Sequence, residues 1–117
     1  MRPESIKNKK EFDGVFDKGK RYHGELLTAV IAKGSGPTKL GIIASHKFGG
    51  SVARNRIKRQ IREAFRSAAD KFTENAETVI IPKELARRAR TPEILADLSS
   101  IIHRAGITQA GNSLSRT

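Results

Sequence analysis

The 117-residue chain has no cysteine, no tryptophan, one tyrosine and only twelve acidic residues. The lack of cysteine excludes disulfides and thiolate metal sites, and it is typical of a reducing compartment. The three histidines, His23, His46 and His103, do not have metal-ligand spacing, so structural zinc is not expected. No apolar run is long enough to cross a bilayer, and the first residues lack the apolar core of a secretory signal. We therefore expect a cytoplasmic protein with no membrane partner.

Positive charge is what the chain has in excess. Its 23 lysine and arginine residues outnumber the 12 acids, and the formal net charge is +11. Self-repulsion at this charge weakens the compact state, so such a balance is typical of proteins with a polyanionic partner. Nucleic acid is the common partner, and an anionic membrane surface is the alternative. The hydrophobic content of 37% is enough for one modest core, which predicts a single domain.

The N-terminal part predicts a short amphipathic helix. Residues 1–8 are irregular, and residues 9–18 follow with helical spacing of their apolar side chains. Phe12 and Phe16 fall on one face of this helix, and Gly19 is placed to end it.

Three apolar segments of strand length and a last helix complete the pattern. Residues 25–32 and 40–45 are joined by the turn-forming segment 33–38, which predicts an antiparallel hairpin. Residues 77–81 predict a third strand that ends at a proline. Residues 93–104 have the apolar spacing of a helix that begins next to a proline.

The most basic segment is also amphipathic. Residues 46–66 hold seven of the 23 basic residues and a single acid. Ser51 is placed to be the N-cap of a helix that runs to about Phe72. Its apolar residues fall on one arc of a helical wheel: Ile57, Ile61, Ala64, Phe65, Ala68 and Phe72. Arg54 and Lys58 flank one edge of this arc, Arg56 lies toward the other, and the opposite side carries Asn55, Arg59, Arg62 and Arg66.

This basic side predicts phosphate binding. Five of the six basic residues between Arg54 and Arg66 are arginine, whose rigid guanidinium fork donates two parallel hydrogen bonds to phosphate oxygens. The alternative is a solvated charged face, but the acids that would neutralise it at i, i+4 are missing except for Glu63. A membrane-surface helix is a second alternative, and it lacks a tryptophan anchor.

The same residues resemble the protein subunit of bacterial ribonuclease P. The hallmark of that family is an arginine-asparagine-arginine helix start, present here as Arg54-Asn55-Arg56 and continued by Ile57-Lys58-Arg59. The wider pattern matches at Gly41, Lys47, Gly49, Val52, Arg62, Glu63, Phe65 and Arg66, and in the first helix at Phe12, Val15, Phe16 and Gly19. The resemblance covers residues 6–82 well.

The resemblance implies an α+β fold, an α/β sandwich with a four-stranded mixed sheet. The implied order is αβββαβα, with an additional short strand near residues 21–24. It also implies a left-handed βαβ crossover through the long helix, against the usual right-handed rule, as in the second domain of ribosomal protein S5. On this basis residues 1–105 form one RNA-binding domain, and the small, polar segment 106–117 is expected to be a disordered tail.

The implied function is endonucleolytic cleavage of precursor tRNA, which frees the mature 5′ end. The chain would belong to an endoribonuclease holoenzyme whose catalytic centre lies in the RNA subunit. There, Mg²⁺ ions held mainly by RNA and substrate activate water. No catalytic residue is expected in this chain, because its twelve acids are dispersed and no nucleophile-base motif is present. The implied partners are the catalytic RNA and precursor tRNA, with no protein partner required.

Site residues follow from the resemblance position by position. The positions that match the binding site of the single-stranded 5′ leader are Phe12, Phe16, Arg54, Asn55, Lys58 and Arg62. Those expected to bind the catalytic RNA are Lys47, Arg56, Arg59 and Arg66. The metal ligands are not predicted. The two phenylalanines have an alternative role as core residues, and Val30 replaces a tyrosine that often lines the leader cleft. A ribosomal or general RNA-binding protein and a small stand-alone ribonuclease remain the competing functions.

Overall fold

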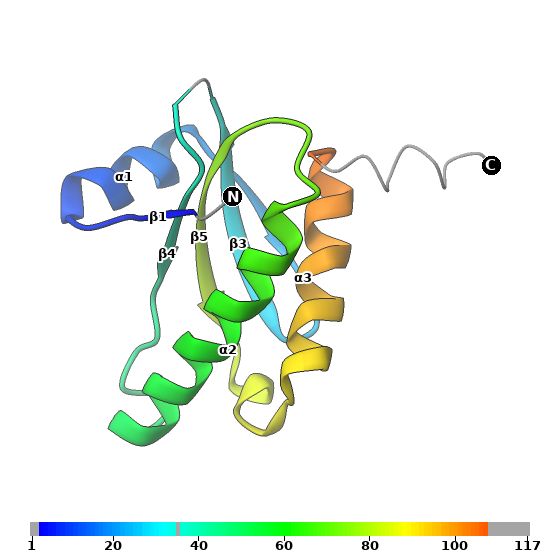
Figure 1. The fold of residues 1–117 in the computed structure, drawn as a ribbon. Helices are drawn as coiled ribbons and strands as arrows, with labels where there is room; N and C mark the ends of the chain where they lie inside the picture. Colours follow the sequence, from blue (N-terminus) through cyan, green and yellow to red (C-terminus); the bar gives the residue numbers. More distant parts are fainter. Residues whose placement is uncertain (1–2, 35, 108–117) are drawn as a thin grey trace.

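A five-stranded mixed sheet forms the centre of the protein, with helices on both faces (Figure 1). The structure is a computed structural model that describes residues 3–34 and 36–107. The elements follow in the order β1 (Glu4–Ser5), α1 (Lys9–Lys18), β2 (Lys20–His23), β3 (Leu27–Lys33), β4 (Lys39–Ile42), α2 (Ser51–Ala69), β5 (Ala76–Pro82), the 3₁₀ helix η1 (Glu84–Arg88) and α3 (Thr91–Ala105). The strand order across the sheet is β1-β4-β5-β3-β2.

The predicted hairpin between residues 25–32 and 40–45 is wrong. Strand β5 lies between β3 and β4, antiparallel to β3 and parallel to β4. Its Val79 and Ile80 point to opposite faces of the sheet, and both side chains are fully buried. A strand that is apolar on both faces is most stable at the centre of a sheet with both faces covered, so burial overrides proximity along the chain here.

The sheet has one strand more than the four expected. Strand β2 lies where the short additional strand was expected, whereas β1 falls in the segment predicted to be irregular. β1 pairs in parallel with β4 through hydrogen bonds from the Glu4 N–H to the Thr38 carbonyl (3.0 Å) and from the Ile6 N–H to the Leu40 carbonyl (2.9 Å). The buried Ile6 side chain holds this short strand in place. The left-handed crossover and the likeness to the ribosomal domain stay predictions.

The helix ends agree with the sequence where a local signal fixes them. The bounds of α1 are as predicted: the Asn8 side chain accepts from the Glu11 N–H (2.9 Å), and the Gly19 N–H donates to the Val15 carbonyl (2.7 Å). A Cβ on Gly19 would lie 2.7 Å from a methyl of Val30, so this close approach of α1 to β3 requires glycine.

The long helix differs from its prediction at both ends. Gly50, not Ser51, is the N-cap residue of α2, and it supplies no side-chain hydrogen bond. The helix ends at Ala69 rather than Phe72, although the Phe72 ring still packs edge-on against Phe65, with ring centroids 5.6 Å apart. The last helix, α3, is slightly longer than predicted, and η1 was not predicted.

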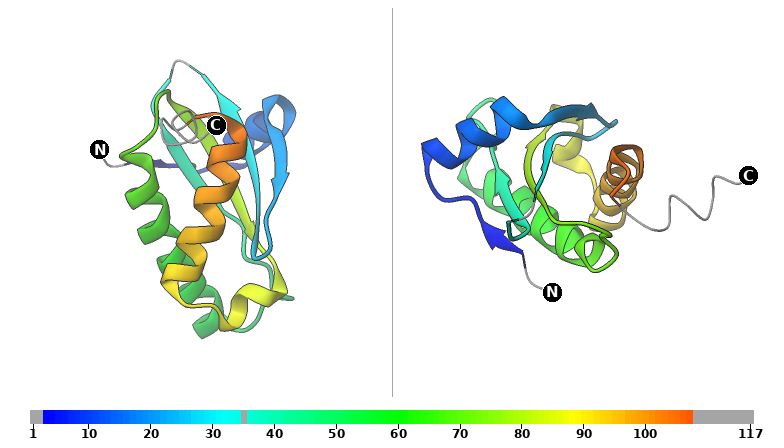
Figure 2. Two further views of the ribbon diagram at one scale, coloured as in Figure 1. Left: turned by 90° about the vertical axis from the view of Figure 1, so that its right-hand side faces the viewer. Right: turned by 90° about the horizontal axis from the view of Figure 1, so that it is seen from above.

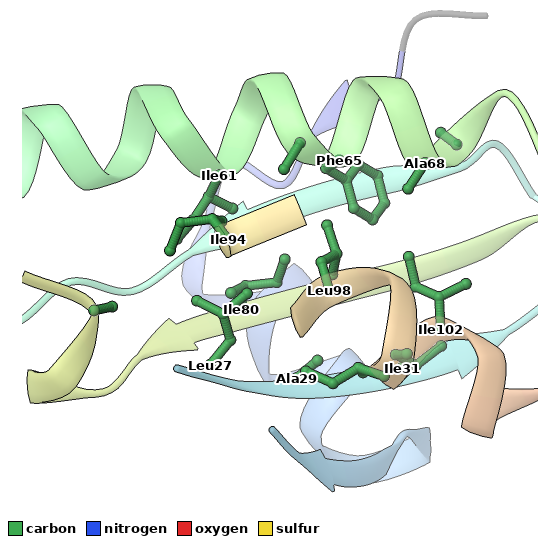
Figure 3. Packing of buried hydrophobic residues seen from close by; sticks show 14 of the residues in the cluster. Leu27, Ala29, Ile31, Ile61, Phe65, Ala68, Ile80, Ile94, Leu98 and Ile102 are labelled. Carbon is green, nitrogen blue, oxygen red and sulfur yellow. The ribbon is translucent and has the colours of Figure 1, made fainter. Parts of the chain in front are cut away.

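The core consists of two apolar layers, one on each face of the sheet. Helices α2 and α3 cover one face, and Figure 3 shows Phe65 of α2 and Leu98 of α3 over the sheet residues Ile31 and Ile80. Helix α1 covers part of the opposite face, as the view from above in Figure 2 shows. The basic helix is therefore anchored by the larger of the two layers.

Helix α3 is tied to the turn between β2 and β3 by one carboxylate. Asp97 accepts hydrogen bonds from the backbone N–H groups of Glu25 (2.9 Å), Leu26 (3.0 Å) and Leu27 (2.9 Å). A Cβ on Gly24 would lie only 2.4 Å from an oxygen of this carboxylate, so a side chain at this position would displace Asp97.

The first two residues of the expected C-terminal tail are part of the domain. Ile107 is fully buried, and its carbonyl accepts a hydrogen bond from the Thr73 N–H (2.7 Å). Gly106 ends α3 in the left-handed conformation, at φ 75°, which favours glycine. The rest of that predicted tail, residues 108–117, lies outside the described residues.

Candidate nucleic-acid interface

Helix α2 has the two-sided character that its sequence predicts. The side chains of Ile57, Ile61 and Phe65 are fully buried against the sheet and α3. The residues exposed on the other side are Asn55, Arg56, Arg59, Arg62 and Arg66, whereas Arg54 and Lys58 are half-buried at the edge. Anchoring through one side leaves the guanidinium groups of the other side free to meet a ligand.

The basic residues of α2 border two separate hollows. Lys58, Arg62 and Arg66 line a cleft of about 430 Å³ whose other walls are β1, β4 and Phe12 of α1. Arg56 and Arg59 line a hollow of about 470 Å³ at the start of α3. Residues four apart on a helix share a face, which explains why 58, 62 and 66 border the same cleft.

The cleft brings together three of the residues predicted to contact the leader: Phe12, Lys58 and Arg62. Arg66, which was predicted to bind the catalytic RNA, lines the same cleft. Asn55, another predicted leader residue, lines neither hollow. The family resemblance assigned these residues to the leader or to the catalytic RNA by their sequence positions. Which hollow each residue lines depends instead on the element that α2 faces at that turn.

Phe12 reaches the cleft because β4 has no side chain beneath it. A Cβ on Gly41 would lie 2.6 Å from Cε1 of the Phe12 ring, so the ring lies directly on the backbone of the strand. Phe16 is half-buried against the apolar layer under α1, which also contains Val30, only 2% exposed. Both phenylalanines therefore pack partly as core residues, and only Phe12 lines the cleft.

Two other predicted residues lie at the start of α2. Lys47 is exposed in the turn that precedes the helix. Arg54 is half-buried, and its Nε is buried without a hydrogen-bond partner in the described structure.

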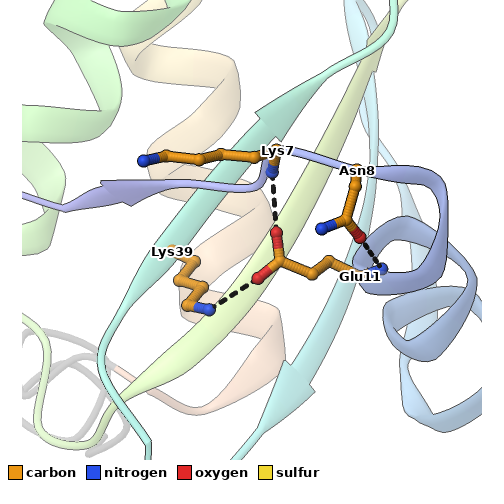
Figure 4. A network of polar contacts seen from close by, with 4 residues as sticks. All are labelled: Lys7, Asn8, Glu11 and Lys39. Carbon is orange, nitrogen blue, oxygen red and sulfur yellow. Dashed lines mark hydrogen bonds and ion pairs between the residues drawn. The ribbon is translucent and has the colours of Figure 1, made fainter.

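A polar network that sequence reasoning missed fixes α1 beside the cleft (Figure 4). The Glu11 carboxylate accepts from the Lys39 ammonium (2.9 Å) on β4 and from the Lys7 N–H (2.8 Å). The hydrogen bond and charge of Lys39 hold the pKa of Glu11 below its usual value, and Glu11 in turn raises the pKa of Lys39. Asn8 and Glu11 have the spacing of a helix N-cap pair, but nothing local indicates Lys39 as their partner.

The arginines of α2 have no acidic partner in the described structure. The ion pairs between described side chains are Lys9 with Asp13 and Lys39 with Glu11, each at 2.9 Å, and both lie on the α1 side. An unneutralised guanidinium row is typical of a surface that binds a polyanion.

Residues 3–34 and 36–107 contain neither a cluster of metal-ligating side chains nor a membrane-spanning helix. No group of three or more histidine, aspartate or glutamate side chains is placed there to hold a metal ion. None of the helices in these ranges is long and apolar enough to span a bilayer.

The fold and its basic helix define a small α+β protein with one strongly cationic helix face. A sequence profile of the family described as Ribonuclease P matches residues 1–106. The chain therefore belongs to the ribonuclease P protein family, and this membership implies a role in the ribonuclease P holoenzyme and in tRNA processing.

Individual relatives agree with this assignment. The ribonuclease P protein component of Clostridium botulinum (strain Loch Maree) is 34% identical over 109 residues, which cover 92% of this chain and 98% of the relative. That of Maridesulfovibrio salexigens is 40% identical over 78 residues, or 64% of this chain and 63% of the relative.

Solved structures of ribonuclease P proteins have the same fold. The Staphylococcus aureus protein superposes with a TM-score of 0.80 at 24% identity, covering 92% of this chain and 100% of that one. The Thermotoga maritima protein superposes with a TM-score of 0.77 at 25% identity, covering 86% and 96%. The predicted α+β class is thus confirmed.

Proposed function

We propose that the protein is the RNA-binding subunit of a cytoplasmic ribonuclease P holoenzyme. It binds the catalytic RNA and the single-stranded 5′ leader of precursor tRNA, and the holoenzyme removes the leader by endonucleolytic cleavage. No further protein partner is required. The observation that carries the proposal is the row of arginines on α2, which have no ion-pair partner among residues 3–34 and 36–107, in a chain that belongs to this family.

The cleft beside Phe12 supports leader binding. An unpaired nucleotide offers a flat base and a charged phosphate, and the cleft offers an aromatic ring opposite Lys58 and Arg62. Stacking of a base on an aromatic side chain is worth about 1–3 kcal/mol. A duplex presents no free base face, so a site of this kind favours a single strand. Arg54, Asn55 and Phe16 are assigned to the periphery of this site.

The part of α2 that faces the start of α3 supports binding of the catalytic RNA. Arg56 and Arg59 border the hollow at the start of α3, and Lys47 extends the charge beyond the helix start. Folded RNA presents closely spaced phosphates, and each one neutralised by a basic side chain releases counterions, which makes the binding salt-dependent. Arg66, near the end of α2, is placed to contact either RNA.

The chemistry of cleavage is assigned to the RNA subunit, and this chain contributes no catalytic residue. We assign Mg²⁺ mainly to the RNA subunit and the substrate, whose phosphate oxygens are ligands that this ion prefers. The part of the protein is to bind and orient the two RNAs.

Reconstitution tests this proposal against its two competitors. Precursor tRNA is incubated with the protein alone, with the catalytic RNA alone and with both, over a series of Mg²⁺ concentrations. We expect no cleavage by the protein alone and a lower Mg²⁺ requirement when both are present. Cleavage by RNA-free protein would instead identify a stand-alone ribonuclease. An Mg²⁺ requirement that the protein leaves unchanged would favour a ribosomal or general RNA-binding protein.

A further inference from the structure

The hollow at the start of α3 contains an arginine that neither the motif on α2 nor the proposed function uses. Arg90, the N-cap residue of α3, lines this hollow together with Arg56 and Arg59 of α2. Three arginines from two distant parts of the chain therefore line one surface depression. Arg90 is exposed, so its side chain is accessible to a large ligand.

The backbone around Arg90 is fixed on both sides. Gln60 is a buried polar residue of α2, and its side-chain amide donates to the carbonyl of the buried Ala89 (3.1 Å). On the other side, the N–H of Arg90 donates to the Glu93 carboxylate (2.7 Å). The Gln60 bond docks the start of α3 against α2, and the Glu93 bond caps α3 from within, so Gln60 acts as a positioning residue for Arg90.

The lining of the hollow has an excess of positive charge, which favours binding of an anion. Glu63 is the single acid in its lining, and no ion pair between described residues involves Arg56, Arg59 or Arg90. Like charges held close together repel one another, and an anion between them removes that cost. Guanidinium groups that line the same hollow from α2 and from the start of α3 can bind different oxygens of one phosphate.

We infer that Arg90, with Arg56 and Arg59, binds a backbone phosphate of the catalytic RNA in the hollow between α2 and α3. The inference rests on the proposed function, in which this side of α2 contacts that RNA. The catalytic RNA is the partner, rather than the leader, because the hollow shares no lining residue with the cleft that contains Phe12. The RNA-binding surface thus extends from α2 onto α3.

The test measures affinity for the catalytic RNA over a series of salt concentrations. Arg90→Ala should weaken binding about three- to tenfold, as expected for loss of one phosphate contact. The slope of log affinity against log salt should become shallower by about one unit. Arg90→Lys, which keeps the charge but not the fork, should keep the slope and lose part of the affinity.

Arg88→Ala is the matched control. Arg88 is also exposed and lies two residues away, but it lines a different groove, with His23 and Arg104. Its replacement removes the same charge and should leave the salt slope unchanged. Equal effects of Arg88→Ala and Arg90→Ala would mean that only the overall charge matters, and this result would overturn the inference.

Arg59→Ala separates failure of the inference from failure of the proposed function. If Arg59→Ala lowers the affinity for the catalytic RNA and neither Arg90→Ala nor Arg90→Lys lowers it, the inference is overturned and the proposed function remains intact. No effect from either site would count against both. Loss of the preference for precursor over mature tRNA in Arg90→Ala, with catalytic-RNA affinity unchanged, would place Arg90 on the leader and also overturn the inference.

Discussion

The carboxylate of Asp97 is expected to be the most costly single polar group to remove from this fold. It accepts three backbone N–H groups from the turn between β2 and β3, at 2.9–3.0 Å. Replacement by alanine leaves these donors without their carboxylate partner and removes one link between α3 and the sheet edge, while the hydrogen bond from Arg104 to the His23 carbonyl (2.8 Å) remains. The N–H of Glu25 is exposed and can bind water, whereas those of Leu26 and Leu27 are partly buried.

The magnitude follows from these three environments. A hydrogen bond to a charged group contributes about 1.5–3 kcal/mol when shielded, and less when water competes. With about 1 kcal/mol for each partly buried donor and less for the exposed one, Asp97→Ala should lower the free energy of unfolding by about 2–3 kcal/mol. Asp97→Asn keeps one acceptor oxygen and should cost about half as much.

Urea unfolding followed by circular dichroism measures these differences. Asp17→Ala is the matched control, because Asp17 is an exposed residue of α1 whose removal changes the net charge equally. We expect this control to stay within about 0.5 kcal/mol of the unsubstituted protein. If Asp97→Ala is no less stable than Asp17→Ala, the three hydrogen bonds do not hold α3 to the sheet as described.

Two further predictions concern the α1 side of the protein. Phe12→Ala should lower the affinity of the holoenzyme for precursor tRNA about fivefold or more, from the loss of one stacking contact, with no change for mature tRNA; an equal loss on both substrates in binding titrations would indicate a core role instead. The Glu11–Lys39 pair should make stability depend on pH at both extremes. Because the pKa of Glu11 is lowered from 4.5, its contribution is present above that pH and is lost as the pH falls through the lowered pKa. The raised pKa of Lys39 means that its contribution is present below 10.5 and is lost as the pH rises through the raised pKa. Glu11→Gln should flatten both limbs of the curve of unfolding free energy against pH, and an unchanged curve would contradict the pairing.

Local signals predicted where α1, α2 and α3 lie in the chain, and long-range burial decided the pairing of the strands. The bounds of α1 were predictable because Asn8 and Gly19 act within one turn of the helix ends. The pairing of β4 was not, because the hydrophobicity of the strands does not reveal which one takes the centre of the sheet. Strand β1 has only two residues, and it is held by the Ile6 side chain and by backbone hydrogen bonds to β4 and the residue before it. A segment this short has no periodic pattern from which a strand could be predicted.

The candidate site shows the same division. A helical wheel predicted which residues of α2 are buried and which are exposed, because that depends on the helix alone. It did not predict which neighbours border the basic residues. Arg66 lines the Phe12 cleft because β1 closes its far side, and Arg90 lines the second hollow because Gln60 docks the start of α3.

Two neighbouring parts of the exposed face of α2 are expected to bind two different RNAs: the part that borders the Phe12 cleft and the part that borders the hollow at the start of α3. The most direct test compares Arg62→Ala and Arg59→Ala in two assays: affinity for the catalytic RNA, and preference of the holoenzyme for precursor over mature tRNA. Arg62→Ala should reduce the preference, with a salt slope for precursor binding shallower by about one unit. Arg59→Ala should reduce catalytic-RNA affinity and leave the preference intact. The same loss from both variants in both assays would contradict the division of α2 into two RNA-binding parts.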